Sequence, residues 1–124
     1  MLSLSIDMSI KCAVLNLDKN ILSAVSSEGY ESPTPIQARA IPLALDGHDI
    51  MASAQTGSGK TAAFLLPTLQ RLTKRSEKPG KGPRALVLTP TRELAAQVEK
   101  NALAYAKNMR WFRTVSIVGG ASFG

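Results

Sequence analysis

The sequence has little cysteine and few acidic residues. Cys12 is the only cysteine among 124 residues, so no disulfide can form within the chain and no thiolate zinc site can be built from it. This usage fits a reducing compartment, and we expect a cytoplasmic protein. The chain has nine acidic and 15 basic residues, which gives a net charge of +6 and a pI near 9.8. A chain of this charge attracts anions.

Long hydrophobic runs are also missing. No stretch approaches the roughly 20 apolar residues that a membrane-spanning helix needs, because 50–54 and 61–69 are closed off by polar residues or prolines. The first 17 residues lack a basic leading segment and a small-x-small cleavage site, so we expect no secretory signal and no membrane partner. With 44% hydrophobic residues the chain can still bury a core, which predicts a globular domain.

The positive charge is concentrated in one segment. Residues 71–84 hold six basic residues and one acid, Glu77, a local net charge of 6 − 1 = +5. The basic residues are Arg71, Lys74, Arg75, Lys78, Lys81 and Arg84. Two prolines and two glycines between 79 and 83 predict a loop. A solvated loop and a surface that faces a polyanion both remain open for this segment.

The apolar spacing predicts four helices and three buried strands. We expect helices from Asp18 to about 29, from 34 to 46 with a kink or a split at Pro42, from 60 to about 74 with a bend at Pro67, and from about 91 to 107. Short apolar runs at 49–54, 84–89 and 112–118 are typical of strands buried on both faces. Strands that alternate with helices predict an α/β fold in three layers with a parallel sheet. Trp111 could stack a base, but beside Phe112 at a strand start we expect it in the core.

Residues 52–61 carry the chemistry of a phosphate-binding loop between a strand and a helix. Gly57 and Gly59 let successive N–H groups turn inward, Lys60 can reach the β and γ phosphates, and Thr61 can ligate Mg²⁺. Ala54 replaces the first glycine of the usual GxxxxGKT pattern, which removes no phosphate ligand. We therefore predict a purine nucleoside triphosphate with Mg²⁺ as the ligand. The predicted nucleotide-binding residues of this loop are Ala54, Gln55, Thr56, Gly57, Ser58, Gly59, Lys60 and Thr61, with Lys60 and Thr61 also catalytic.

Gln37 is a candidate for recognising the base of the bound nucleotide. A glutamine amide can accept from adenine N6 and donate to N7, whereas guanine offers two acceptors there. Gln37 lies one helical turn after Thr34-Pro35, the signature of a helix start. On residue chemistry alone, an ordinary surface glutamine remains the alternative.

Four segments together resemble a known family. In order and spacing, 29–37, 52–61, 90–95 and 119–120 resemble the Q motif, motif I, motif Ia and GG motif of the DEAD-box ATP-dependent RNA helicases, most closely the bacterial RhlE-type members. The resemblance runs from about residue 15 to the last residue. It implies a RecA-like P-loop NTPase fold that binds ATP and Mg²⁺.

The resemblance also implies residue roles. Gln37 would read adenine, Tyr30 would pack on the base, Lys60 would bind the β and γ phosphates, and Thr61 would help to hold Mg²⁺. The residues implied to lie along the RNA backbone are Pro90, Thr91, Arg92, Gly119 and Gly120. A helix start and paired glycines suit phosphate contacts, which carry little sequence preference.

The sequence ends at Gly124, before the Asp-Glu-Ala-Asp segment and the second RecA-like domain of that family. We therefore expect an amino-terminal arm over 1–17 and a truncated first RecA-like domain over 18–124, which alone neither hydrolyses ATP nor unwinds RNA. Cys12 stands where the family usually has an aromatic residue, and we expect it to pack as a small apolar side chain. The alternative function is a stand-alone basic RNA-binding module without nucleotide-dependent activity.

Overall fold

The computed structural model describes residues 15–30, 32–57, 59–78, 80 and 82–120. Four α-helices follow one another in these residues: α2 (Lys19–Ser27), α3 (Pro35–Leu45), α4 (Lys60–Leu72) and α5 (Arg92–Tyr105). All four predicted helices are thereby confirmed, with ends close to the expected ones. Cys12, Ser58 and most of the predicted arm lie outside the described residues.

Local hydrogen bonds explain why the helices begin where they do. The Asp18 carboxylate caps α2 by accepting from the backbone N–H of Asn20 at 2.8 Å. Thr91 caps α5 through its hydroxyl, which accepts from Leu94 N at 3.1 Å. Pro35 is the first residue of α3, where its missing N–H costs no helical hydrogen bond. These signals are visible in the sequence, which is why the helix starts could be predicted.

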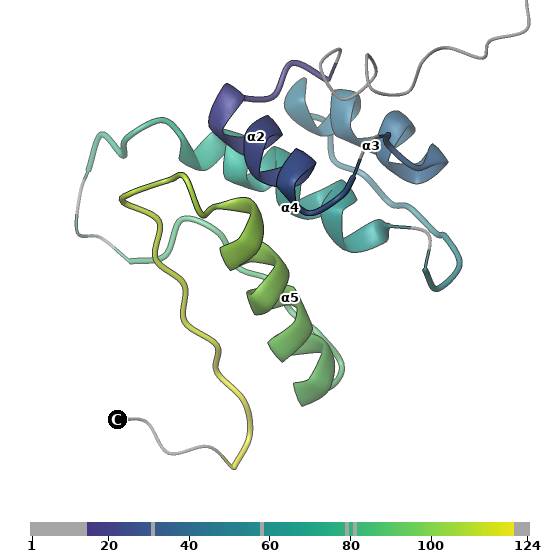
Figure 1. Ribbon diagram of the computed structural model, residues 1–124. Coiled ribbons are helices and arrows are strands. Elements are labelled where there is room, and N and C mark those ends of the chain that lie inside the picture. The colour runs from purple at the N-terminus through teal and green to yellow at the C-terminus, as the bar shows by residue number, and fades with distance from the viewer. Residues whose placement is uncertain (1–14, 31, 58, 79, 81, 121–124) are drawn as a thin grey trace, which may run out of the picture.

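The core forms where the other helices pack around α4. Helix α4 contacts each of the other three, and Figure 1 shows it crossing behind α2 and beside α3 and α5. Ile21 and Ile41 are fully buried and Leu69 is 1% exposed. The other buried core residues are Leu15, Leu17, Val25, Ala62, Leu65, Leu66, Val98, Ala102, Tyr105, Ala106 and Met109. A single apolar cluster therefore fixes where both ends of α4 lie.

The three predicted strands are not paired in the described residues. Segments 48–55, 85–89 and 112–118 carry no helix or strand there, and no backbone hydrogen bond joins them to one another. Their apolar side chains are largely exposed, as Leu86 at 79% and Val115 at 79% show. In Figure 1, segment 112–118 and segment 48–55 run on opposite sides of the helices. A strand requires a hydrogen-bonding neighbour about 4.8 Å away, and apolar composition alone does not supply one.

The expectation that Trp111 lies in the core is wrong. Phe112 packs against the core, but the Trp111 side chain is 53% exposed. Its indole Nε1 donates to the carbonyl oxygen of Leu72, the last residue of α4, at 3.3 Å. An indole that finds its partner at a helix end can leave its ring in solvent.

None of the described helices combines the length and the apolar character needed to cross a bilayer.

We expect Leu69→Ala to destabilise the chain strongly. Leu69 is 1% exposed in the middle of the core, so truncation removes buried contacts and leaves a cavity, at a cost of about 2–5 kcal/mol. Leu103→Ala is the matched control, because Leu103 is 50% exposed and its truncation should change stability by about 0.5 kcal/mol or less. Urea unfolding followed by circular dichroism measures both, and similar losses would contradict this description of the core.

Candidate functional site

The predicted phosphate-binding loop leads directly into α4. Gly57 and Gly59 both have φ of +82°, a left-handed conformation that favours glycine. Gly59 is the N-cap of α4, and Lys60 and Thr61 form its first turn. The first N–H groups of a helix have no partner within it, and they form the positive end of the helix dipole. The start of α4 therefore offers backbone donors, and the side chain of Lys60 is exposed.

Gln37 is buried against this loop. Its side chain is 4% exposed, and both ends of its amide are bonded. Oε1 accepts from the backbone N–H of Thr34 at 3.1 Å, and Nε2 donates to the carbonyl oxygen of Gly59 at 3.1 Å. These partners distinguish the amide oxygen from the amide nitrogen. One Oε1 lone pair and one Nε2 hydrogen are still available for a ligand.

The N-cap of α3 completes this contact. Thr34 and Gln37 occupy the two positions of a capping box, but only the bond from Thr34 N to Gln37 is formed. Thr34 Oγ1 is buried and has no hydrogen-bond partner in the described part of the chain. This hydroxyl lies next to Gly59, since a Cβ at Gly59 would stand 3.0 Å from it. A buried hydroxyl with unused bonding capacity beside the loop is a polar group that a ligand could satisfy.

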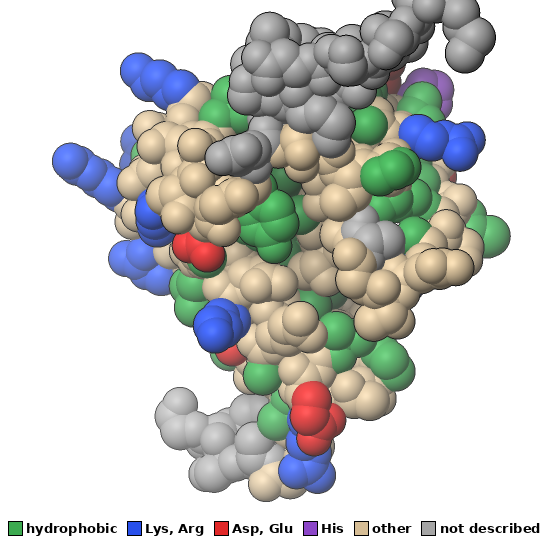
Figure 2. All heavy atoms as spheres, turned by 45° about the vertical axis from the view of Figure 1, so that its right-hand side comes forward, with side chains coloured by type: hydrophobic (Ala, Val, Ile, Leu, Met, Phe, Trp, Pro, Cys, Tyr) green, Lys and Arg blue, Asp and Glu red, His purple; other side chains and the backbone are tan. Residues whose placement is uncertain are grey.

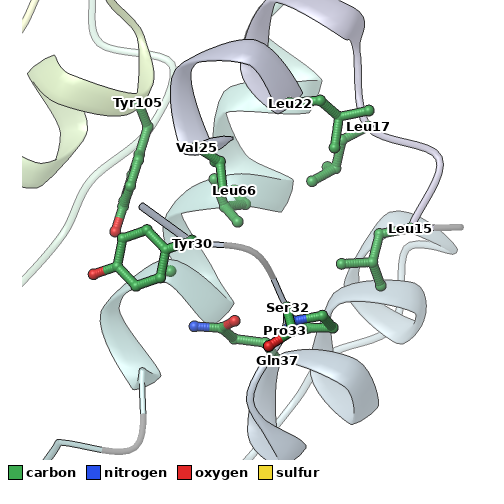
Figure 3. A pocket seen from close by; sticks show the side chains of 11 residues that line it. Leu15, Leu17, Leu22, Val25, Tyr30, Ser32, Pro33, Gln37, Leu66 and Tyr105 are labelled. Atoms are coloured by element: carbon green, nitrogen blue, oxygen red, sulfur yellow. The ribbon is translucent and has the colours of Figure 1, made fainter. Parts of the chain in front are cut away.

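Tyr30 is held beside Gln37 by Tyr105 from the end of α5. The two rings meet edge to face, with centroids 6.2 Å apart and planes at 64°. Figure 3 shows the Tyr105 hydroxyl directed at the Tyr30 ring, with the Gln37 side chain lining the same pocket. Tyr105 is 3% exposed, whereas Tyr30 is 44% exposed. Burial, and next the neighbouring Tyr30 hydroxyl, raise the pKa of Tyr105 above its ordinary range.

Two hollows adjoin these residues. The one in Figure 3 is an apolar cavity of about 10 Å³, which has room for about one water. The other is a cleft of about 1170 Å³ that opens between α3, α4, α5 and segment 85–89, large enough for a nucleotide. Residues that line the cleft include Tyr30, Thr34, Thr56, Gly57, Gly59, Lys60 and Thr61. The cleft is therefore bordered by Tyr30 and the predicted phosphate loop, while Gln37 lines the small cavity, which Tyr30 also borders.

The predicted RNA-contacting residues form a second group at the start of α5. Thr91 and Arg92 begin this helix, and the Thr89 hydroxyl donates to the carbonyl of Thr91 at 3.1 Å. Gly120 lies against the Arg92 guanidinium, because a Cβ there would stand 3.4 Å from Nη2. Pro90 and Gly119 are exposed beside them. Helix α5 spans about 20 Å over its 14 residues, so this group is separate from the Tyr30–Tyr105 contact at the opposite end of the helix.

Two contacts could not be read from the sequence. The Tyr30–Tyr105 contact joins positions 75 residues apart (105 − 30), and no spacing in the sequence indicates it. The packing of Gln37 on Gly59 joins positions 22 residues apart. The sequence predicts separate ligand contacts for Gln37 and Gly59 and no contact between them.

Comparison with known families matches residues 34–124 to the DEAD/DEAH box helicase model. The chain belongs to this family. The ATP-dependent RNA helicase SrmB of Escherichia coli is 50% identical over 109 residues, which cover 88% of this chain and 24% of SrmB.

Solved structures of the family share the fold. Prp28 from Chaetomium thermophilum bound to ADP is 49% identical with a TM-score of 0.79, over 87% of this chain and 26% of Prp28. Dbp5 of S. cerevisiae bound to RNA and ADP BeF3 is 33% identical with a TM-score of 0.70, over 79% of this chain and 25% of Dbp5. The chain thus has the RecA-like α/β fold of this family and spans about a quarter of these relatives. None of the three relatives tests the finer resemblance to RhlE-type members.

Gly59→Ala should damage the site more than Gly57→Ala. Both positions have φ of +82°, so each alanine costs about 1–2 kcal/mol of backbone strain. Only the Gly59 Cβ would also collide with Gln37 Nε2 and crowd Thr34, while nothing lies within 4 Å of a Cβ at Gly57. Urea unfolding should therefore show the larger loss for Gly59→Ala, and equal losses would contradict the packing of Gln37 on Gly59.

The raised pKa of Tyr105 predicts a loss of stability at alkaline pH. Because the folded chain holds this proton more tightly than the unfolded chain, the free energy of unfolding should fall as the pH rises above about 10, where unfolded tyrosine ionises. Tyr105→Phe removes the titrating group and should flatten the profile in this range. Urea unfolding at a series of pH values measures both chains, and identical slopes would argue against the burial of this hydroxyl.

Proposed function

We propose that this chain is the adenine-nucleotide-binding and RNA-binding part of an ATP-dependent RNA helicase. The observation that carries the proposal is the Gln37 amide, which is fixed against Gly59 with one donor and one acceptor unused. Those two groups match N7 and N6 of adenine. The names of the relatives, and the ADP in the Prp28 structure, support the same ligand class.

The residues of the cleft fit a nucleotide with Mg²⁺. The Gly57–Gly59 turn and the start of α4 would receive phosphate oxygens, and Lys60 would pair with the β and γ phosphates. No cluster of three His, Cys, Asp or Glu side chains within the described residues could hold a metal. A magnesium ion would therefore depend on the Thr61 hydroxyl and on phosphate oxygens. When bound, it would neutralise charge on the transferring phosphate.

The base would lie on the open side of Tyr30. The Tyr105 contact takes one edge of this ring and leaves the side chain 44% exposed, and an exposed ring beside a base-reading amide suits stacking. Ala54, Gln55 and Thr56 continue the loop on the other side of Gly57 and complete the proposed nucleotide contacts.

RNA would contact the group at the start of α5. Thr91 and Arg92 present a helix start and a guanidinium, and Pro90, Gly119 and Gly120 lie beside them. Such groups position a phosphate backbone without reading sequence. The Dbp5 structure, which contains RNA, supports this ligand class. We further propose that residues 18–124 are part of a first RecA-like domain preceded by an arm over 1–17, in a cytoplasmic protein, and that hydrolysis requires carboxylates from the rest of the helicase.

A nucleotide titration tests the proposal. A fluorescent adenine nucleotide with Mg²⁺ should bind the chain and be displaced by ATP in preference to GTP. Gln37→Ala should reduce this preference by about 1–3 kcal/mol, the value of one bidentate base contact. Lys60→Ala should abolish binding because it removes the cation for the β and γ phosphates, while Lys100→Ala, an exposed lysine on α5, should leave it unchanged.

The outcomes separate the two candidate functions. Equal displacement by GTP and ATP would contradict the assignment of Gln37 to adenine. A folded chain that binds RNA but no nucleotide would instead support the stand-alone basic module.

A further inference from the structure

The end of α4 opposite the phosphate loop carries an exposed tryptophan. Trp111 is 53% exposed, and its indole Nε1 is bonded to the carbonyl oxygen of Leu72. This bond ties the ring to the last residue of a helix that belongs to the core, so the ring has a fixed position with much of its surface in solvent. A ring held in this way loses little conformational freedom when it binds a flat ligand.

Basic residues gather at the same end of α4. The Arg84 guanidinium donates to the carbonyl of Lys74 at 2.8 Å and to that of Arg71 at 3.3 Å, which ties the loop after α4 to this helix end. Arg113 Nη1 donates to the carbonyls of Phe112 at 2.8 Å and Arg110 at 3.3 Å. We call the following exposed residues the α4-end surface: Lys74, Arg75, Lys78, Arg84, Arg110, Trp111 and Arg113.

The figures agree with this arrangement. In Figure 1 the loop that follows α4 and the turn that follows α5 lie on the same left-hand side of the molecule, as the bond from Trp111 to Leu72 requires. In Figure 2 several Lys and Arg side chains project along the left-hand edge, with few acidic ones among them. Glu77 is the one acidic residue among 71–84.

We propose that the α4-end surface binds single-stranded RNA, with a base stacked on Trp111 and phosphates paired with the surrounding cations. An exposed ring among cations matches a strand whose bases are free to stack and whose backbone is anionic. A duplex keeps its base faces covered, and an acidic polypeptide offers carboxylates without flat bases. The described hydrogen bonds engage the side chains of Arg84 and Arg113 but not those of Lys74, Arg75 or Arg110.

This site is distinct from the proposed nucleotide and RNA sites. The 13 residues of α4 place it about 20 Å from Lys60, and segment 112–118 separates it from Gly119 and Gly120. It depends on neither proposed function, because its ring and cations need no nucleotide. In a chain that acts on RNA, it would hold a second stretch of the same strand.

Tryptophan fluorescence provides a direct test, because Trp111 is the only tryptophan of the chain. An oligouridine of about ten nucleotides should quench its emission on binding. If about four phosphates are paired, a fourfold rise in salt concentration should weaken binding about 50-fold. Inorganic polyphosphate, which has no bases, should compete with the RNA without quenching to the same extent.

Variants separate stacking from charge. Trp111→Ala should weaken binding of a fluorescein-labelled oligouridine about tenfold in an anisotropy assay, and Trp111→Phe should retain part of the affinity. The double variant Arg75→Glu with Arg110→Glu should weaken binding more than Arg39→Glu with Lys100→Glu, which changes the net charge equally at exposed positions on α3 and α5.

Several results would overturn the proposal. Binding of oligouridine without quenching would place the RNA elsewhere, and equal losses from the two charge-reversed variants would show that only net charge matters. Equal quenching by polyphosphate or by polyglutamate would exclude base stacking. The quenching should persist in Lys60→Ala and in Arg92→Ala. The test of the α4-end surface can therefore be interpreted even if the proposed nucleotide site or the proposed RNA contacts of α5 fail.

Discussion

The contact between Gln37 and Gly59 is the constraint on which the site depends. One buried amide accepts from the start of α3 and donates to the residue that caps α4. An asparagine is one methylene shorter and could not span both partners. A glutamate would face the Gly59 carbonyl with an oxygen in place of a donor. Because Gly59 leaves no room for a Cβ beside this amide, the two positions require each other. The residue proposed to read the base and the proposed phosphate loop are thus packed together.

Helix α5 gives the site a second connection. Its C-terminal residue Tyr105 is buried against Tyr30, and its first residue Arg92 lies against Gly120. Val98 and Ala102 bury the middle of the helix in the core, so the helix is held along its length. In the proposed function, a change at the nucleotide end and a change at the RNA end would act on the same rigid element, which offers a physical route for coupling the two ligands.

The sequence predicted the parts of this structure that local chemistry decides. Capping residues such as Asp18 and Thr91, and the proline after Thr34, mark helix starts through bonds to nearby backbone groups. The left-handed glycines before α4, Gly57 and Gly59, are equally local signals. The sequence predicts paired strands at 49–54, 84–89 and 112–118, but no backbone hydrogen bond joins these segments in the described residues. An apolar extended segment does not specify which segment it pairs with. The prediction that Trp111 lies in the core is wrong for a related reason, since its hydrogen-bond partner is a helix-end carbonyl 39 residues away.

The basic side chains of residues 71–84 have two different physical roles, and the sequence alone could not distinguish them. Arg71 donates to the carbonyl of Ala44 near the end of α3, and Arg84 donates to two carbonyls at the end of α4. Cations at these places donate to carbonyls near a helix end and oppose the negative end of the helix dipole, so these two arginines stabilise the fold whether or not an anion binds. Lys74 and Arg75 have no such bond among the described residues. They add charge beside the exposed Trp111 ring, and in the proposed RNA contact this charge is free to pair with phosphates.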